Sequence, residues 1–466
     1  MTLRILLLAT YELGRQPFGL ASPAAWLRDA GFEVTCVDLS REKLTAGGLA
    51  HAGLVAVHLP MHTATRLALP LIERVKALRP DVCLCAYGLY ALPNAELLRD
   101  RGVDVVLGPE FESDLVGVAR RVSEAGSDAT PAGASGASEW QRGDDGHAPG
   151  GLPRLAFLRP DRSDLPALRR YAAVQLPSGE RRVTGYTEAS RGCKHRCRHC
   201  PIVPVYDGRF RVVSPDVVLA DVAAQVAAGA RHITFGDPDF FNGVGHAREI
   251  VKRLAAACPG VTYDVTIKIE HLLRHRDALA LLRDTGCLFV TSAVEAVDDR
   301  VLRRLEKGHT RADFEAVVAI MRSVRLPLSP TFVAFTPWTT LEGYAELLQA
   351  LAALDLVEAV APVQLALRLL VPARSRLLEL PEVTALAGAW DPGTLAHPWR
   401  HEDARVDALQ RDVLRLVGRR LNAPRRDVFE AVVQLTEAAL GRPLLLDLAP
   451  RPARVTVPYL TEPWYC

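Results

Sequence analysis

The chain has 466 residues, of which 49% are hydrophobic, and its formal net charge is +2. This length predicts two to four domains with large buried cores, and the balanced charge gives no indication of a nucleic-acid partner or an anionic membrane surface. The apolar run near the N-terminus, ILLLA, is too short for a signal peptide, and no segment is long enough to cross a bilayer. We therefore expect a cytoplasmic protein whose nine cysteines serve in core packing, metal binding or catalysis.

Residues 1–122 alternate continuous apolar runs with amphipathic stretches. The apolar runs, which we interpret as strands, are LRILLLAT, FEVTCVDLS, AGLVAVHLPMH, DVCLCAYGLY and VDVVLG. Continuous apolar strands are typical of a parallel sheet that is covered on both faces, so this region predicts a doubly wound α/β domain with its ligand crevice at the carboxyl ends of the strands. Cys36, Cys83 and Cys85 lie inside these strands and are expected to pack in the core.

A second βα series follows a stretch at residues 123–153 that is rich in Ser, Gly, Ala, Pro and Asp and is predicted to be a disordered linker. The strands predicted within residues 154–378 are VTGYTEASRG, HITFGDPDF, TYDVTIKIE, LFVTSAVEA, LPLSPTFVAFTP and PVQLALRLLVP. Six βα repeats predict a partial TIM barrel with its chemistry at the carboxyl ends of the strands. Residues 379–466 predict a helical region that ends in the tail VPYLTEPWYC.

Three cysteines lie close together in the loop that leaves the first strand of this barrel. Cys193, Cys197 and Cys200 follow the pattern C-x-x-x-C-x-x-C. Three thiolates can hold three irons of a cubane iron–sulfur cluster and leave the fourth iron open to a non-protein ligand. A structural zinc site needs four ligands, which His195 or His199 can complete, so zinc stays an alternative. Basic neighbours favour thiolates and an anionic cluster, and these are Arg191, Lys194, Arg196 and Arg198.

The cysteine triad, its place after the first strand and the βα series behind it resemble the radical S-adenosylmethionine (SAM) superfamily. The resemblance implies that the open iron of a [4Fe–4S] cluster chelates SAM, and that an electron from the cluster cleaves SAM to give a 5′-deoxyadenosyl radical. It further implies a small-molecule substrate and an electron donor such as flavodoxin or ferredoxin. His199 departs from the family pattern, in which an aromatic residue often precedes the third cysteine. A non-enzymatic iron–sulfur or zinc scaffold is the rival hypothesis.

The resemblance assigns candidate SAM contacts to the rim of the barrel. Gly236, Asp237 and Asp239, in FGDPDFF after the second strand, match by position a motif that meets the methionine amino group, although an Asp at a helix cap is the alternative. Glu295 ends the fourth strand, where the family often places a polar residue on the ribose hydroxyls. Further candidates by rim placement are Lys268, Glu270, Ser292 and, more weakly, Arg368.

The segment LEKGHTR, residues 305–311, resembles one that is common in radical SAM enzymes with cobalamin-type domains. It makes His309 and Arg311 candidates for the SAM carboxylate, and a plain loop with Thr310 as a helix N-cap is the alternative. A doubly wound domain before the barrel resembles the cobalamin-binding subclass, in which an Asp-x-His-x-x-Gly loop supplies a histidine to cobalt. Here that loop reads ATYELGRQPFG, without histidine, and the resemblance does not assign His58 or His62 to cobalt. Cobalamin-dependent methyl transfer or rearrangement and cobalamin-free radical chemistry therefore both stay open.

The tail resembles the end of a radical SAM family whose members finish in Cys-Cys-Ala-Glu-Pro or Cys-selenocysteine-Ala-Glu-Pro. Cys466 stands where the first cysteine of that motif would stand. We expect the next codon to be UGA, meant as selenocysteine and read as a stop. A Cys–selenocysteine pair can act as a redox partner, a hydrogen-atom donor or a soft ligand in chemistry on a sulfur, selenium or arsenic compound. An inert exposed thiol is the alternative.

Overall fold

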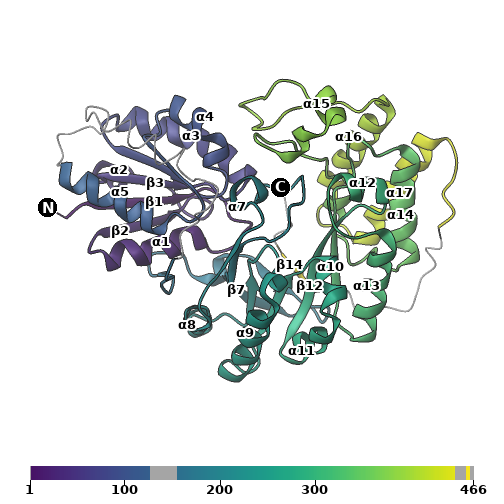
Figure 1. Cartoon of the computed structure of the whole chain (residues 1–466), viewed down its shortest axis with the longest axis horizontal. Coiled ribbons are helices and arrows are strands. Elements are labelled where there is room, and N and C mark those ends of the chain that lie inside the picture. Colours follow the sequence, from purple (N-terminus) through teal and green to yellow (C-terminus); the bar gives the residue numbers. More distant parts are fainter. Residues whose placement is uncertain (1, 126–154, 447–457, 462–466) are drawn as a thin grey trace.

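The computed structural model describes residues 2–125, 155–446 and 458–461, and its N-terminal part is a five-stranded parallel sheet (Figure 1). The strands lie in the order β2-β1-β3-β4-β5. Their bounds are β1 (Arg4–Ala9), β2 (Glu33–Asp38), β3 (Leu54–His58), β4 (Cys83–Tyr87) and β5 (Val105–Leu107). The helices around them are α1 (Phe18–Asp29), α2 (Ala46–Ala50), α3 (His62–Leu78), α4 (Ala95–Asp100) and α5 (Glu112–Ala125). The predicted doubly wound domain is confirmed.

Alternate residues of each central strand pack into different cores, because successive side chains of a strand point to opposite faces. Leu6 and Leu8 pack with α3 and α4, whereas Ile5 and Leu7 pack with α1 and α5. Both faces of the sheet are therefore covered, which explains the continuous apolar runs. Helix α5 continues to Ala125, so the first three residues of the predicted linker are helical, and the rest of that prediction lies outside the described residues.

The second sheet has the strand order β13-β12-β11-β10-β7-β6-β14 and forms a partial barrel. Five of its strands are parallel, namely β7 (Arg181–Thr187), β10 (His232–Phe235), β11 (Thr262–Thr266), β12 (Cys287–Glu295) and β13 (Leu328–Phe332). Antiparallel strands β6 (Ala173–Gln175) and β14 (Tyr459–Leu460) extend one edge. A separate hairpin, β8 (Ser190–Gly192) with β9 (Phe210–Val212), holds the two ends of the cysteine segment together.

The sixth predicted barrel strand, PVQLALRLLVP, is only a single bridge between Phe335 and Arg368 in the structure. Its first residues form a 3₁₀ helix, Pro362–Leu365. Pro362 has no N–H to donate to a ladder. The Gln364 side chain accepts a hydrogen bond from the Phe332 N–H, so a side-chain amide takes the place of strand pairing beside β13. The strand prediction for this segment is wrong, although the fold class is confirmed.

Helices cover the outer face of the barrel and continue into the C-terminal region (Figure 1). The barrel helices are α7 (Val203–Tyr206), α8 (Pro215–Ala227), α9 (Val244–Ala257), α10 (Ile269–Arg274), α11 (Leu279–Asp284), α12 (Asp299–Arg304), α13 (Arg311–Ser323) and α14 (Leu341–Ala353). The C-terminal helices are α15 (Pro381–Leu386), α16 (Ala404–Arg419) and α17 (Arg425–Leu440). Val413 of α16 and Phe429 of α17 belong to the same hydrophobic core as Tyr344 of α14. Within the described ranges, no helix has the length and apolar character that a bilayer span requires.

A buried ion network joins the N-terminal domain to the segment before the cysteines. The Arg191 guanidinium in β8 donates to Glu112 at 2.6 Å and to Glu188 at 2.8 Å. Glu112 is the first residue of α5 and is fully buried. The Tyr206 hydroxyl donates to Glu110 at 2.7 Å, which adds a second link between the two parts. The N-terminal domain therefore contacts the cysteine segment on both sides, at β8 and at α7.

Candidate functional site

The cysteine loop runs from β8 to α7 and is held by Asn242. The Asn242 side chain accepts from the Lys194 backbone N–H at 3.2 Å and donates to the Gly192 carbonyl at 3.3 Å. Its Oδ1 also lies 3.7 Å from Cys193 Sγ. Gly192 has φ = +74°, and a Cβ there would lie 2.5 Å from the Arg209 carbonyl oxygen. Only glycine fits this turn, which fixes the direction in which the loop leaves the hairpin.

The geometry of the three cysteines fits a cluster better than a single zinc ion. Cys193 and Cys197 are buried and Cys200 is half-buried, so the three thiols are largely shielded from solvent. Both histidines that can complete a zinc site face carboxylates instead: His199 lies 3.0 Å from Glu295, and His195 lies 3.5 Å from Asp239. The donor set of three spaced thiols therefore fits the three protein-bound irons of a cubane.

The cations that face the thiols are two lysines from the rim and not the predicted arginines of the loop. Lys268 Nζ lies 3.7 Å from Cys197 Sγ, and the charge of Lys307 acts on the Cys200 thiol. By contrast, the loop arginines pair with carboxylates: Arg191 with Glu112 and Glu188, Arg196 with Asp207, and Arg198 with Glu306. Burial raises the pKa of Cys200 to about 12, so the thiol is protonated until a metal or cluster displaces its proton.

Three of the predicted SAM contacts lie beside Cys197 and Cys200, namely Lys268, Glu295 and His309. Glu295 ends β12 and accepts from Lys307 Nζ at 3.3 Å. Burial by itself raises the pKa of the Glu295 carboxyl, but Lys307 and His199 lower it to about 2, so the carboxylate is ionised at neutral pH. Lys268 and Lys307 are 7% and 2% exposed. The site thus holds two buried ammonium groups and one buried carboxylate next to the thiols.

Two buried polar side chains here have no hydrogen-bond partner among the residues that the structure describes. The Ser292 hydroxyl on β12 and both ring nitrogens of His309 are unpartnered. Burial, together with the charges of Lys307 and Lys268, lowers the pKa of His309 to about 4, so its imidazole is neutral at physiological pH. Buried polar atoms are nearly always satisfied, so these side chains are candidates to contact a polar ligand.

Arg311 lies apart from this group. Its guanidinium pairs with Glu315 on the exposed face of α13. Thr310 is the N-cap of α13 and forms a capping box with Asp313, as the N-cap alternative expected, and the contact of Arg311 with SAM stays a prediction. His309, the neighbour on the loop side, lies close enough to Lys268 for that charge to lower its pKa. The first turn of the helix therefore carries Arg311 away from the thiols, while the loop residues before it face them.

The acidic loop after β10 is engaged with other protein groups. The Asp237 carboxylate accepts from the Ala189 N–H at 2.9 Å and from the Ser190 hydroxyl at 2.5 Å, and thereby fixes the chain just before β8. Asp239 accepts from the Phe241 N–H and caps a 3₁₀ helix, Phe240–Gly243, as the alternative for this motif expected. Gly236 lies against Tyr186, because a Cβ there would be 1.8 Å from the tyrosine oxygen. The contact of these residues with SAM stays a prediction.

Replacing Asp237 with asparagine is expected to remove a pH dependence of stability. Burial raises the pKa of this carboxyl to about 7, whereas the unfolded value is near 3.8. The folded state thus binds the extra proton, so the free energy of unfolding falls by about 1.4 kcal/mol per pH unit as the pH rises between those two pKa values. Asp237→Asn keeps the shape without the ionisation. Urea unfolding of the apoprotein at pH 5, 6, 7 and 8 measures the slope, and the exposed Asp284→Asn is the control. A slope that Asp237→Asn leaves unchanged would contradict the assignment.

Three residues of the site are not predicted from the sequence, and a fourth, predicted residue lies outside the described part of the chain. Lys307 stands inside the segment LEKGHTR, in which the resemblance points to His309 and Arg311. Asn242 follows FGDPDFF by one residue, and no pattern in the sequence marks it. His271 belongs to α10, where its spacing is that of an ordinary amphipathic helix. The predicted catalytic residue Cys466 lies outside the described residues.

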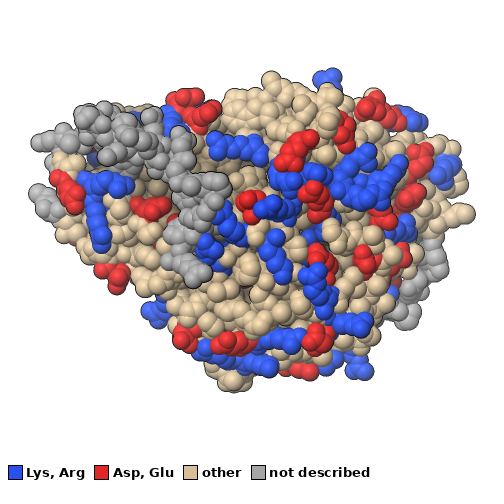
Figure 2. Space-filling view, viewed as in Figure 1, with Lys and Arg blue, Asp and Glu red and all other residues tan. Residues whose placement is uncertain are grey.

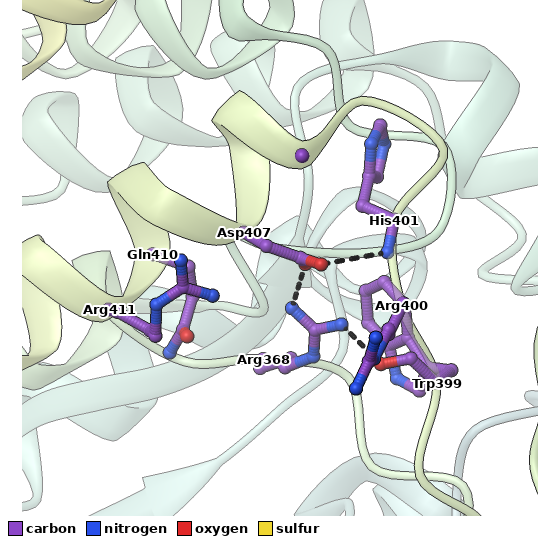
Figure 3. Close-up of a pocket in the computed structure, with 8 residues that line it drawn as sticks. Arg368, Trp399, Arg400, His401, Asp407, Gln410 and Arg411 are labelled. Carbon is purple, nitrogen blue, oxygen red and sulfur yellow. Dashed lines mark hydrogen bonds and ion pairs between the residues drawn. The ribbon is translucent and has the colours of Figure 1, made fainter.

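Arg368, the weakest SAM candidate, lines a different cavity of about 560 Å³ (Figure 3). Its guanidinium donates to Asp407 of α16 at 2.7 Å and to the Trp399 carbonyl at 2.6 Å, and it stacks on the Trp399 ring. The remaining lining comes from α16 and from the Trp399–His401 segment, and it includes none of the cysteines or other SAM candidates. Arg368 therefore ties α16 to the barrel edge.

Side chains of the N-terminal domain pack on one another at the carboxyl end of β3. His58, at the end of β3, packs against the rings of Tyr87 and Phe111 at centroid distances of 5.2 and 5.7 Å, and its Nδ1 lies 3.6 Å from Glu12. A Cβ at Gly19 would lie 1.9 Å from the His58 ring. His62 contacts the Thr394 carbonyl instead. The residues present do not fit a cobalamin whose cobalt is held by an imidazole of the loop after β1.

Comparison with known proteins gives a family match over the barrel. Residues 187–349 match the family model described as the radical SAM superfamily. Members of this superfamily are enzymes, and the domain implies a [4Fe–4S] cluster and SAM. The chain is 27% identical over 206 residues to the ribosomal protein uS12 methylthiotransferase RimO of Desulforudis audaxviator. This alignment covers 41% of this chain and 44% of the relative. The chain is 29% identical over 180 residues to a tRNA-2-methylthio-N(6)-dimethylallyladenosine synthase of Chlorobaculum tepidum, covering 36% and 39%. The chain thus spans less than half the length of these two curated relatives.

Two solved structures share the fold over more of the chain. The cobalamin-dependent S-adenosylmethionine radical enzyme OxsB, with aqua-cobalamin and S-adenosylmethionine bound, superposes with a TM-score of 0.67 and 11% identity, covering 94% of this chain and 72% of that one. The radical S-adenosylmethionine methyltransferase TsrM of Kitasatospora setae, with cobalamin and a [4Fe–4S] cluster bound, has a TM-score of 0.56 and 18% identity, covering 76% and 71%. At these identities the likeness shows the fold alone.

Proposed function

We propose that this chain, which carries a radical SAM domain, is an enzyme that cleaves SAM reductively at a [4Fe–4S] cluster on Cys193, Cys197 and Cys200 and so begins radical chemistry on a small molecule. The observation that carries the proposal is the meeting of these thiols with two buried lysines and one buried carboxylate. When bound, the cluster and SAM supply a one-electron cleavage of a carbon–sulfur bond. The chain's own residues bind and orient the two cofactors.

The charges of the site match the methionine end of SAM. The ammonium groups of Lys268 and Lys307 are suited to its carboxylate, and the ionised Glu295 is suited to its amino group or its ribose hydroxyls. Ser292 and the neutral imidazole of His309 offer the unpartnered polar atoms that such a ligand would satisfy. The site also excludes water well, since all five side chains are buried. Low solvent access strengthens each of these electrostatic contacts.

Replacing Lys307 with methionine is expected to weaken SAM binding about 10- to 100-fold, because a hydrogen bond to a charged group contributes about 1.5–3 kcal/mol. Equilibrium binding of SAM to the cluster-loaded, unreduced protein measures the effect. Arg311→Met is the matched control, since Arg311 stands four residues away and pairs with Glu315 on the surface. Equal dissociation constants for the wild type and Lys307→Met would remove Lys307 from the SAM site.

Cobalamin-dependent methyl transfer or rearrangement is the first candidate for the overall reaction. It is favoured by the fold that this chain shares with OxsB over 94% of its length. Because the described crevice lacks a histidine ligand from the loop after β1, cobalamin would have to bind without that ligand. Cobalt analysis of protein reconstituted with hydroxocobalamin decides the question: about one cobalt per chain supports this reaction, and none favours cobalamin-free chemistry on a sulfur, selenium or arsenic compound.

The nature of the substrate and the electron donor stay predictions. We expect a small molecule and a flavodoxin or ferredoxin. The curated relatives are named for tRNA and for a ribosomal protein, so the expected lack of a nucleic-acid partner needs its own test. On the face shown in Figure 2, lysine and arginine side chains are interspersed with acidic ones. The likeness of the tail to the Cys–selenocysteine family likewise stays a prediction.

Incubation with SAM and dithionite tests the proposed function. Anaerobically reconstituted protein is expected to release 5′-deoxyadenosine and methionine in equal amounts, and a sample without dithionite is the control. A protein that binds iron and sulfide but releases no 5′-deoxyadenosine is the non-enzymatic scaffold. A protein that holds zinc in place of iron and sulfide contradicts the cluster as well.

A further inference from the structure

We infer a second metal site, for a divalent transition-metal ion, formed by His195, Asp239 and His271. One ligand atom from each of these residues lies within 4.8 Å of the other two. His195 and His271 have no part in the proposed cluster or in the SAM contacts, and an ion held by Asp239 would replace the SAM contact predicted for that residue. The inference therefore goes beyond the proposed function and holds whether or not the chain cleaves SAM.

The three side chains come from three different elements that meet at the rim of the barrel. His195 belongs to the cysteine loop, Asp239 follows β10, and His271 lies in α10. Asp239 and His271 are fully buried, and the His195 side chain is 13% exposed. Two imidazoles and one carboxylate in a buried cluster are a typical ligand set for zinc or ferrous iron.

The polar atoms of this cluster lie close to one another. His271 Nδ1 lies 2.7 Å from Asp239 Oδ2, and His195 Nε2 lies 3.5 Å from the same oxygen. Yet Asp239 Oδ2, His195 Nε2 and both ring nitrogens of His271 find no hydrogen-bond partner in the part of the chain that the structure describes. Ligands at about 2.0–2.1 Å from one ion are about 3 to 3.4 Å apart, close to the spacing here.

The surrounding contacts resemble those that usually orient metal ligands. The other carboxylate oxygen of Asp239 accepts from the Phe241 N–H at 3.1 Å, which leaves Oδ2 free to ligate. The second nitrogen of His195, Nδ1, faces Glu270 Oε2 at 3.6 Å. Metal-bound histidines commonly direct their other nitrogen to a carboxylate, which fixes the tautomer and the ring orientation.

Three protein ligands leave coordination positions open to water or another ligand. Because His195 lies between two of the cluster cysteines, an ion here would fasten the cysteine loop to β10 and α10. A bound divalent cation would also balance the Asp239 charge in a buried place. The ion thus has a structural consequence for the loop in addition to any chemistry at its open positions.

Metal analysis of the full chain tests the inference. Anaerobically cluster-reconstituted wild type, His271→Ala, Asp239→Asn and His275→Ala are dialysed against Zn²⁺, and zinc, iron and sulfide are measured in each. His275 is the matched control, because its ring lies 5.7 Å from that of His271 but outside the cluster. Asp239→Asn keeps an oxygen for the Phe241 N–H, so it preserves the local fold if His271→Ala does not.

We expect about one zinc per chain in the wild type and in His275→Ala, and at least ten-fold weaker zinc binding in the other two variants. An additional high-spin ferrous iron in the Mössbauer spectrum, lost in the same two variants, supports the site equally. The inference is overturned if the wild type holds no such ion, or if both variants bind it as tightly as the wild type. Zinc that appears only as iron and sulfide are lost from the wild type also overturns the inference, because that zinc ion is bound by the cysteines in place of the cluster.

Discussion

Replacing Cys197 with alanine is expected to abolish both the cluster and the release of 5′-deoxyadenosine. Cys197 is 6% exposed and its sulfur is the one that Lys268 approaches. With two thiolates left, the cube has two irons without protein ligands, and iron and sulfide are lost. We expect the rate of SAM cleavage to fall by about a thousand-fold or more, an effect on the order of 4 kcal/mol or greater in the barrier.

Iron, sulfide, visible absorbance and 5′-deoxyadenosine are measured on the same preparations. Cys258→Ala is the matched control, because this partly buried thiol ends α9 and lies outside the loop. Circular dichroism shows whether each variant folds. A Cys197→Ala protein with full iron, full sulfide and wild-type activity would prove the ligand set wrong, whereas loss of the cluster in Cys258→Ala alone would move the cluster elsewhere.

The architecture could be predicted because parallel strands that are covered on both faces appear in the sequence as continuous apolar runs. Leu6 and Leu8 enter one core and Ile5 and Leu7 the other, so every residue of the run must be apolar. The same pattern misled at the sixth barrel strand. That segment is as apolar as a strand, but Pro362 lacks an N–H, and the Gln364 side chain accepts the hydrogen bond from Phe332 that a neighbouring strand would accept.

The rim position of the site was predictable in part. Parallel strands end at one edge, so residues at the carboxyl ends of β11 and β12, such as Lys268 and Glu295, lie at the same rim without being near in sequence. Which residue of LEKGHTR faces the thiols was not predictable, because it depends on where α13 begins. Thr310 caps the helix, which directs Arg311 outward and leaves Lys307 inside. The arginines of the cysteine loop were misjudged, since sequence proximity to a thiol does not show which carboxylates the other elements bring.

Replacing Arg191 with methionine is expected to destabilise the protein by about 3–5 kcal/mol, the usual cost of removing one partner from a buried ion network. Its guanidinium is the cation among Glu110, Glu112 and Glu188, of which the first two are buried. Burial raises the pKa of the Glu110 and Glu188 carboxyls even with Arg191 present, so the ionised form of each is already disfavoured in the folded protein. Without the guanidinium, they must take up protons or separate.

The position of Arg191 extends this effect to the cluster. Arg191 lies two residues before Cys193 in the short hairpin that sets the direction of the loop, and Glu112 holds it from the N-terminal domain. We therefore expect Arg191→Met to lower the thermal unfolding temperature and the iron content together. Arg196→Met is the control, because Arg196 is exposed and pairs with Asp207. Arg191→Lys should rescue little, since an ammonium cannot reproduce the forked contacts to Glu112.

A second substitution separates the charge effect from the packing effect. In Arg191→Met, changing Glu112 to Gln removes the buried charge that was left unpaired and should recover part of the lost stability, whereas Glu112→Gln alone should be destabilising. If Arg191→Met keeps wild-type stability and iron content, the N-terminal domain does not support the cysteine loop through this contact. If the double variant is as unstable as the sum of the single ones, Arg191 acts by packing on Phe111 and Phe157 instead.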